Sequence, residues 1–377
     1  MLVRLPRSPA PRRLKCTLAA FFLLISAAAA VACQLCYEAV RQMVTIGQRL
    51  DMADRAVLAV PFADANRFRI VEVVKGKDAV GDIIADPPTG LGEATAPGSE
   101  PCLLVRDPLA SEWTSLGTIR AENAGWLRQL VATAFVKRDR PRPTWPSNMQ
   151  MSSTLSYAGW RQRVALVLPY LENSDPLAAQ IAWGELARAP YAILDVARSQ
   201  IDAAAVESWL DDPKLVTRYA AYTLLLGFVG GPADAARLEQ HIEAAWSSHD
   251  ATNLAAMIGA DLELRGPSRV GWVEAMYFAD RSRTMPEIEA ALLALNVHGD
   301  ANRTVPRQRV IQAYRAFIRE RPRMAGFVAQ QLADWDYWDA ATEYAALLKS
   351  NTITDPASHF AVVNYLQRAA SANAALE

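Results

Sequence analysis

Two cysteines spaced as Cys-x-x-Cys, Cys33 and Cys36, are the most site-like feature of the chain. A redox pair of this kind needs a strand that runs into a helix, a setting that lowers the pKa of one thiol. No strand pattern precedes Cys33, and a c-type haem would require histidine where Tyr37 stands. We therefore favour a structural or lipidation role over redox catalysis. Cys36 and Cys102 are the candidates for a disulfide.

The other residues able to do chemistry form no recognisable constellation. The four histidines are far apart in the sequence and lack metal-ligand spacing. Gly76-Lys77 lacks the following Ser or Thr and the upstream glycine of a phosphate-binding loop, and no Gly-x-Ser-x-Gly motif occurs. We expect no metal and no cofactor, and we interpret the protein as non-enzymatic.

The densest aromatic group comprises Trp335, Tyr337 and Trp338. Tryptophan and tyrosine are enriched at the energetic centres of protein interfaces, so these residues are candidates for an interaction surface. The alternative is that they pack between the last helices of the chain. The sequence leaves both interpretations open.

The N-terminal residues 1–32 have the three parts of a secretory signal peptide: a basic stretch ending at Lys15, an apolar run from Leu18, and small residues up to the cleavage region. The apolar run is short for a membrane span, which needs roughly 20 residues. A retained membrane anchor is the alternative. We expect an exported protein of the periplasm or cell envelope.

The cleavage region permits two mature N-termini. Ala30-Val31-Ala32 suits ordinary signal peptidase, and Ala30-Val31-Ala32-Cys33 resembles the lipobox of bacterial lipoproteins, with alanine where leucine is usual. Cleavage would leave three cysteines, an odd number in an oxidising compartment. Acylation of Cys33 would leave Cys36 and Cys102 free to pair. Both a free protein and one attached to the membrane through a lipidated N-terminus stay open.

The charge distribution argues against nucleic-acid binding. The formal net charge is −1, yet five basic residues fall within the first 15 positions and no acidic residue precedes Glu38. Removal of the signal peptide would therefore leave an acidic chain without a basic stripe.

Residues 33–136 have the pattern of a small β-module. Short apolar or alternating runs predict strands over 55–60, 67–74, 81–84, 102–105 and 113–119, separated by turn signals, with a short helix around Trp126. Several short strands of this kind are typical of an open or closed barrel.

This module resembles the netrin-like, OB-type modules related to the tissue inhibitors of metalloproteinases. The resemblance rests on Cys33 and Cys36, the strand openings at 53–57, 68–76 and 81–84, and the strand from Cys102 to Val105. It implies a barrel-like fold and, by analogy, protein binding. The first two cysteines are separated by two residues instead of one, and the family's set of disulfides cannot form. The family's inhibitory activity is therefore not expected.

A Pro- and Arg-rich linker is predicted over 137–154, and a helical domain over 155–377. In the helical domain, eight prolines precede apolar-periodic runs at intervals close to one or two times 18 residues. Proline is favoured at the first position of a helix, and an aspartate before it can cap the helix. The pattern resembles HEAT-type repeats, which stack helix pairs into an α-solenoid.

The fold class predicted is therefore multidomain: a β-barrel-like module followed by an all-α, HEAT-like solenoid. The curved face of a solenoid offers an extended surface for protein partners. We expect an exported scaffold that binds another protein, whose identity the sequence does not reveal. Two alternatives are an enzyme or enzyme accessory with a cryptic site, and a purely structural envelope lipoprotein.

Overall fold

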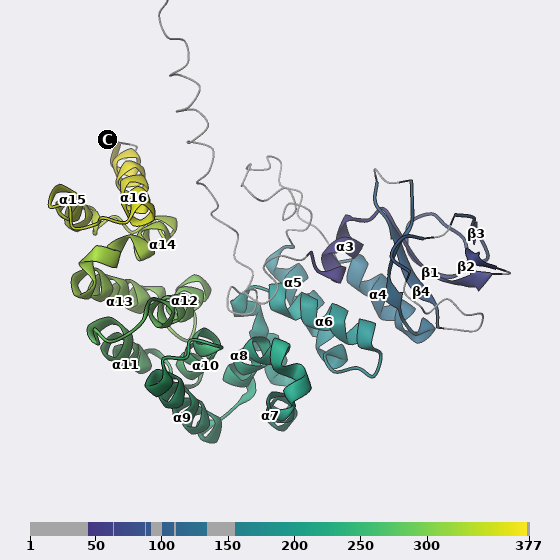
Figure 1. Cartoon of the computed structure of the whole chain (residues 1–377), viewed down its shortest axis with the longest axis horizontal. Coiled ribbons are helices and arrows are strands. Elements are labelled where there is room, and N and C mark those ends of the chain that lie inside the picture. The colour runs from purple at the N-terminus through teal and green to yellow at the C-terminus, as the bar shows by residue number, and fades with distance from the viewer. Residues whose placement is uncertain are drawn as a thin grey trace, which may run out of the picture.

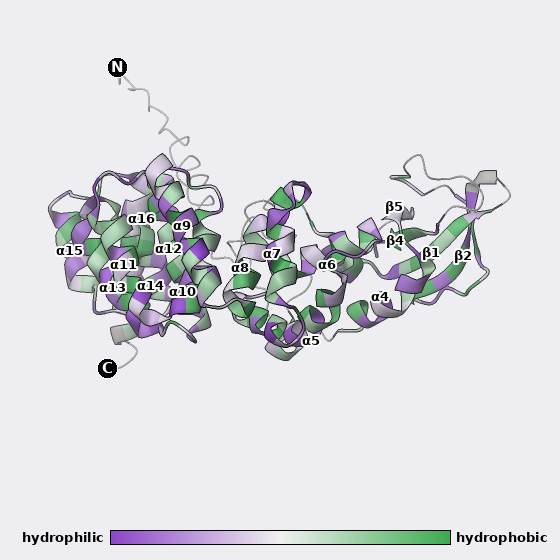
Figure 2. Ribbon diagram, turned by 90° about the horizontal axis from the view of Figure 1, so that it is seen from below, coloured by the Kyte–Doolittle hydropathy of each residue, from purple (hydrophilic) through white to green (hydrophobic). Residues whose placement is uncertain are grey.

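The computed structural model describes residues 44–62, 64–86, 88–91, 100–108, 111–133 and 155–374. A small antiparallel sheet near the N-terminus is followed by a mostly helical part (Figure 1). The sheet and the last helices lie at opposite ends of the molecule in both Figure 1 and Figure 2. The predicted signal peptide, the two N-terminal cysteines and the predicted linker lie outside the described residues.

The sheet has the order β3-β2-β1-β4-β5, and each strand lies where the sequence predicts one. The strands are β1 (Arg55–Phe62), β2 (Asp64–Lys75), β3 (Ile83–Ile84), β4 (Cys102–Arg106) and β5 (Thr114–Thr118). Among the described strands, no pairing joins β3 to β5, so this sheet is open.

Alternation along strand β1 divides the sheet into two faces. Ala56 and Leu58 belong to the main core, which includes helix α4 (Ala124–Val131), whereas Val57 and Ala59 belong to a small second core. Successive residues of a strand point to opposite faces, which explains the division. One face of the sheet is therefore covered by helices, and the other face carries the small second core.

A fully enclosed ionic network joins the residues before the sheet to the helical part. Asp51, at the end of helix α3 (Ile46–Met52), accepts hydrogen bonds from Arg163 at 2.6 and 2.9 Å and from Arg188 at 2.7 Å. Glu185 lies 2.8 Å from the guanidinium groups of both arginines. Buried charges of this kind persist only when they are paired.

Eight helical segments of the second part begin where the proline pattern predicts. All eight prolines lie at the start of a helix or immediately before it, and Asp175 and Asp212 each accept backbone hydrogen bonds as caps. The α-helices are α5 (Tyr157–Val167), α6 (Pro176–Arg188), α7 (Ala203–Asp211), α8 (Tyr219–Val229), α9 (Pro232–Ser248), α10 (Leu254–Arg265), α11 (Val270–Val273), α12 (Met285–Ala301), α13 (Arg307–Glu320), α14 (Ala329–Asp334), α15 (Ala341–Lys349) and α16 (Pro356–Ala374). Shorter 3₁₀ and π segments are η1 (Ala121–Asn123), η3 (Leu168–Tyr170), η4 (Tyr191–Ser199), η5 (Pro213–Arg218), η6 (Pro267–Arg269), η7 (Glu274–Ala279) and η8 (Pro322–Val328).

These helices follow one another along a curved path (Figure 1). Helix α10 packs between α8 and α12, α12 packs on α13, and α14 packs on α16. Small residues permit close approach, since a Cβ on Gly227 would lie only 2.8 Å from Cα of Ala260. The α-helices range from four residues in α11 to 19 in α16, so they are irregular in length.

One hydrophobic core runs through both parts of the molecule. It extends from Leu50, through Leu103 of the sheet and Leu127 of α4, to Ala369 of the last helix. Hydrophobic residues accordingly appear in strands β1 and β2 and along the helices in Figure 2. No helix of the described part is long and apolar enough to cross a lipid bilayer.

Candidate functional site

A pocket opens on the face of the sheet that the helices leave uncovered. It encloses about 380 Å³ between strand β1, the β2–β3 turn, strand β3 and the residues before β5. Arg55 of β1 and Arg106 of β4 both line it, and Trp113 closes one side. A cavity of this size with apolar and charged walls falls within the range of small-molecule sites.

The two arginines of this pocket share a single aromatic surface. The guanidinium carbons of Arg55 and Arg106 lie 5.0 and 5.8 Å from the ring centroid of Trp113. Arg55 also forms an ion pair with Asp78, whose side chain is only 2% exposed. Burial and the neighbouring charge of Arg106 lower the pKa of Arg55. The two cations therefore oppose each other inside the pocket.

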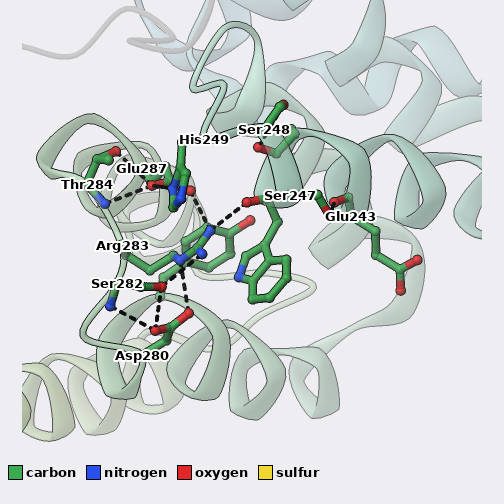
Figure 3. Close-up of polar contacts among 12 residues, drawn as sticks. Glu243, Ser247, Ser248, His249, Asp280, Ser282, Arg283, Thr284 and Glu287 are labelled. Carbon is green, nitrogen blue, oxygen red and sulfur yellow. Dashed lines mark hydrogen bonds and ion pairs between the residues drawn. The ribbon is translucent and has the colours of Figure 1, made fainter.

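A second polar cluster joins the end of α9 to the start of α12 (Figure 3). Buried Glu287 accepts hydrogen bonds from the backbone and hydroxyl of Thr284, from Arg283 at 2.7 Å and, in one tautomer, from Nδ1 of His249 at 3.1 Å. Burial opposes ionisation of Glu287, but these donors and the Arg283 charge outweigh it and lower its pKa. Arg283 also donates to the Trp246 carbonyl at 2.8 Å.

We interpret this cluster as one that holds two helix ends in place. A histidine held by a carboxylate resembles half of a nucleophile-activating triad, which also requires a hydroxyl on the histidine. The nearby Ser247 and Ser248 hydroxyls instead donate to helix carbonyls of Glu243 and Ala244, at 2.8 and 2.9 Å. The cluster thus caps two helices and ties them together.

A third cluster surrounds His298, which is completely buried in α12. Its Nε2 lies 2.9 Å from the carbonyl oxygen of Gly259 and 3.4 Å from the hydroxyl of Tyr191. Its Nδ1 lies 3.9 Å from Glu263, which Arg198 also contacts at 3.0 Å. Burial lowers the pKa of His298, so its neutral form is favoured. Nothing in the local sequence indicates these partners, because they lie 35 to 107 residues away.

The aromatic residues predicted as an interaction surface are partly buried against the main core. Trp335 stacks on Tyr314 at 5.6 Å and donates to Asp300 at 2.8 Å. Tyr337 receives a hydrogen bond on its carbonyl from Tyr365, and Trp338 packs against the same Tyr365 ring. The structure therefore places all three in the packing between α13, α14 and α16, with part of each side chain still accessible.

Two of the predicted cysteine sites lie outside the described residues, and the third lies within them. Cys33, the candidate for lipidation or the mature N-terminus, and Cys36 lie outside the described residues. Cys102 is buried on β4 and forms no disulfide with a described residue. Burial raises the pKa of its thiol, which makes Cys102 a poor nucleophile at neutral pH.

The described residues include no group of three or more His, Cys, Asp or Glu side chains arranged to hold a metal ion. Comparison with known proteins adds no assignment: no family model, curated protein or solved structure matches the chain.

Proposed function

We propose that this protein is an exported, non-enzymatic scaffold that binds another protein through its helical part. In this proposal the irregular row of helices acts as a HEAT-like solenoid, and the open sheet belongs to an OB- or netrin-like module. Support comes from the eight helical segments that begin at or next to a proline and from the curved, sequential packing of the helices (Figure 1). Extended surfaces of this type suit long protein segments.

One observation carries the choice of binding surface. Two phenylalanines, Phe327 of η8 and Phe360 of α16, are 36% and 38% exposed. Their elements are in direct contact, because a Cβ on Gly326 would lie 2.4 Å from Cα of Ser358. Exposed aromatic side chains on adjoining elements are typical of interface centres. We therefore place the partner, through an apolar segment, on the surface formed by η8 and α16.

The binding test compares cross-linked partners of three forms of the full protein in an envelope extract of its source organism. The variant F327S/F360S removes the proposed surface, while V216S removes a more exposed apolar side chain (61% exposed) on η5. We expect at least one partner that wild type and V216S capture and F327S/F360S loses. Equal capture by all three, or none by any, would contradict the proposal; the latter fits a purely structural lipoprotein.

The proposed location has a separate test. We propose that residues 1–32 are removed and that Cys33 becomes an acylated N-terminus, as one of the two outcomes that the sequence permits. Intact mass after expression in a bacterial envelope distinguishes them. Added acyl mass on a chain starting at Cys33 supports the anchor, whereas an unmodified chain starting there supports a free periplasmic protein. Retention of residue 1 would contradict export by cleavage.

A further inference from the structure

Strands β1 and β4 place two like charges directly opposite each other. Their antiparallel register pairs Arg55 with Arg106, so both side chains leave the same face of the sheet. Like charges in such a cross-strand pair destabilise a sheet. The pair is also desolvated in part by Trp113, which is only 8% exposed.

Among the described residues, Asp78 alone forms an ion pair with one of these two arginines. Asp78 is engaged by Arg55 through both the Nε and a terminal nitrogen. Among the described residues, no carboxylate lies within ion-pair distance of Arg106, and its guanidinium lies over the Trp113 ring. The guanidinium of Arg106 therefore faces the pocket with its hydrogen-bond donors available to an anion.

The rest of the pocket disfavours the binding of a simple anion. Asp82, Asp86 and Glu112 line its exposed part, and their negative charge disfavours a phosphate or sulfate that offers nothing positive. Ile70 and Ile84, which belong to the small second core on this face of the sheet, add an apolar wall. The lining thus has three chemically distinct parts: a cationic floor, an acidic rim and an apolar side.

We propose that this pocket binds a zwitterionic amino acid or short peptide. Its carboxylate would sit on Arg106 beside Arg55, its ammonium group would face the acidic rim, and an apolar side chain would contact Ile84. A bound carboxylate relieves the repulsion between the two arginines, which gives the binding a physical reason. The sheet that carries this pocket lies at the opposite end of the molecule from α16 (Figure 1), so this inference is independent of the protein-binding proposal.

Isothermal titration calorimetry tests the proposal with leucyl-leucine as the probe. We expect one site with a dissociation constant of about 1 mM or tighter. The C-terminal amide and the N-acetyl form of the dipeptide each lose one charge, and each should bind at least about tenfold more weakly. Inorganic phosphate carries only negative charge and putrescine only positive charge, so these two probes report binding driven by charge of a single sign.

Two variants separate the pocket from the rest of the module. R106Q removes the free guanidinium, and it should abolish dipeptide binding while leaving the melting temperature unchanged or higher, because the repulsion disappears. R69Q is the control: Arg69 lies on β2, with its guanidinium 4.0 Å from the Phe62 ring, and is not part of the pocket lining. R69Q should bind the dipeptide like wild type.

Four results would overturn the proposal. They are no heat from leucyl-leucine at 10 mM, equal affinity for the dipeptide and its amide, tighter binding of phosphate or putrescine than of the dipeptide, and unchanged affinity in R106Q. If R106Q unfolds, E112Q replaces it, and unchanged affinity in E112Q then contradicts the role of the acidic rim.

Discussion

Burial of His298 couples the stability of the protein to pH. The ring lies within the α10–α12 contact, and its pKa is lowered by burial. An unfolded histidine titrates near pH 6.5. Between that value and the lower folded pKa, the unfolded chain binds more protons than the folded one, so the free energy of unfolding falls as the pH decreases. The slope is at most about 1.4 kcal/mol per pH unit for one proton.

We predict that H298Q removes this part of the pH dependence. Urea unfolding at pH 7.5, 6.0 and 5.0 should give a shallower loss of stability in H298Q than in wild type, whatever the stability of the variant at pH 7.5. His359 is exposed on α16, so H359Q should retain the wild-type slope. Parallel slopes for wild type and H298Q would contradict the prediction.

Gly47 lies against the buried ionic network, where a larger side chain has no room. A Cβ on Gly47 would lie 1.6 Å from Oε1 of Glu185, and that carboxylate is held by Arg188 at 3.0 Å. We predict that G47A destabilises the protein by about 1–3 kcal/mol, because overpacking forces the ion network apart. Gly125 in α4 has open space where its Cβ would be, so G125A should be neutral or up to about 1 kcal/mol stabilising. Chemical denaturation of both variants gives the comparison; equal effects would refute the explanation.

At the scale of elements, one aspartate connects the sheet to the helical part. Asp175 caps α6 by accepting from the backbone of Leu177 and Ala178. It also accepts from the backbone N–H of Arg120 and from the side-chain amide of Asn123, at 2.8 Å each. Asp202 caps α7 in an exposed position, with a backbone bond from Ala204.

We predict that D175A destabilises the protein more than D202A does. Loss of a helix cap alone costs about 1 kcal/mol. D175A also removes the acceptor of the buried Asn123 side-chain amide. Leaving that donor unsatisfied adds about 1–3 kcal/mol to the loss of stability. Thermal unfolding of the two variants measures the difference. Equal melting temperatures would show that the bonds to Arg120 and Asn123 contribute nothing.

Elements were predictable where a local signal specifies them. Short apolar or alternating runs located every strand of the described sheet, and Asp-Pro pairs located helix starts such as Pro176 and Pro213. The sites were not predictable in this way. Arg163 and Arg188 meet Asp51 over separations of 112 and 137 residues, and Arg106 faces Arg55 only because of the strand order. Such meetings depend on topology, which no local pattern encodes.

At the scale of the whole molecule, the sheet and the helices share one hydrophobic interior. Leu103 of β4 and Leu127 of α4 belong to the same core as the last helix. The Asp51 network adds charged contacts between helices α3, α5 and α6. Separating the two parts would expose apolar surface and break this network, which leaves any charge that stays buried without its partner.

This shared interior predicts that the sheet and the helices unfold together. L103A removes a fully buried side chain of the sheet and should destabilise the protein by about 2–5 kcal/mol. Far-ultraviolet circular dichroism at 222 nm, which reports mainly the helices, should then melt at the same lowered temperature that calorimetry gives, in one transition. V80A, at a side chain 66% exposed, should leave that temperature unchanged. If L103A instead produces two transitions and only the smaller one shifts, the parts fold as independent domains.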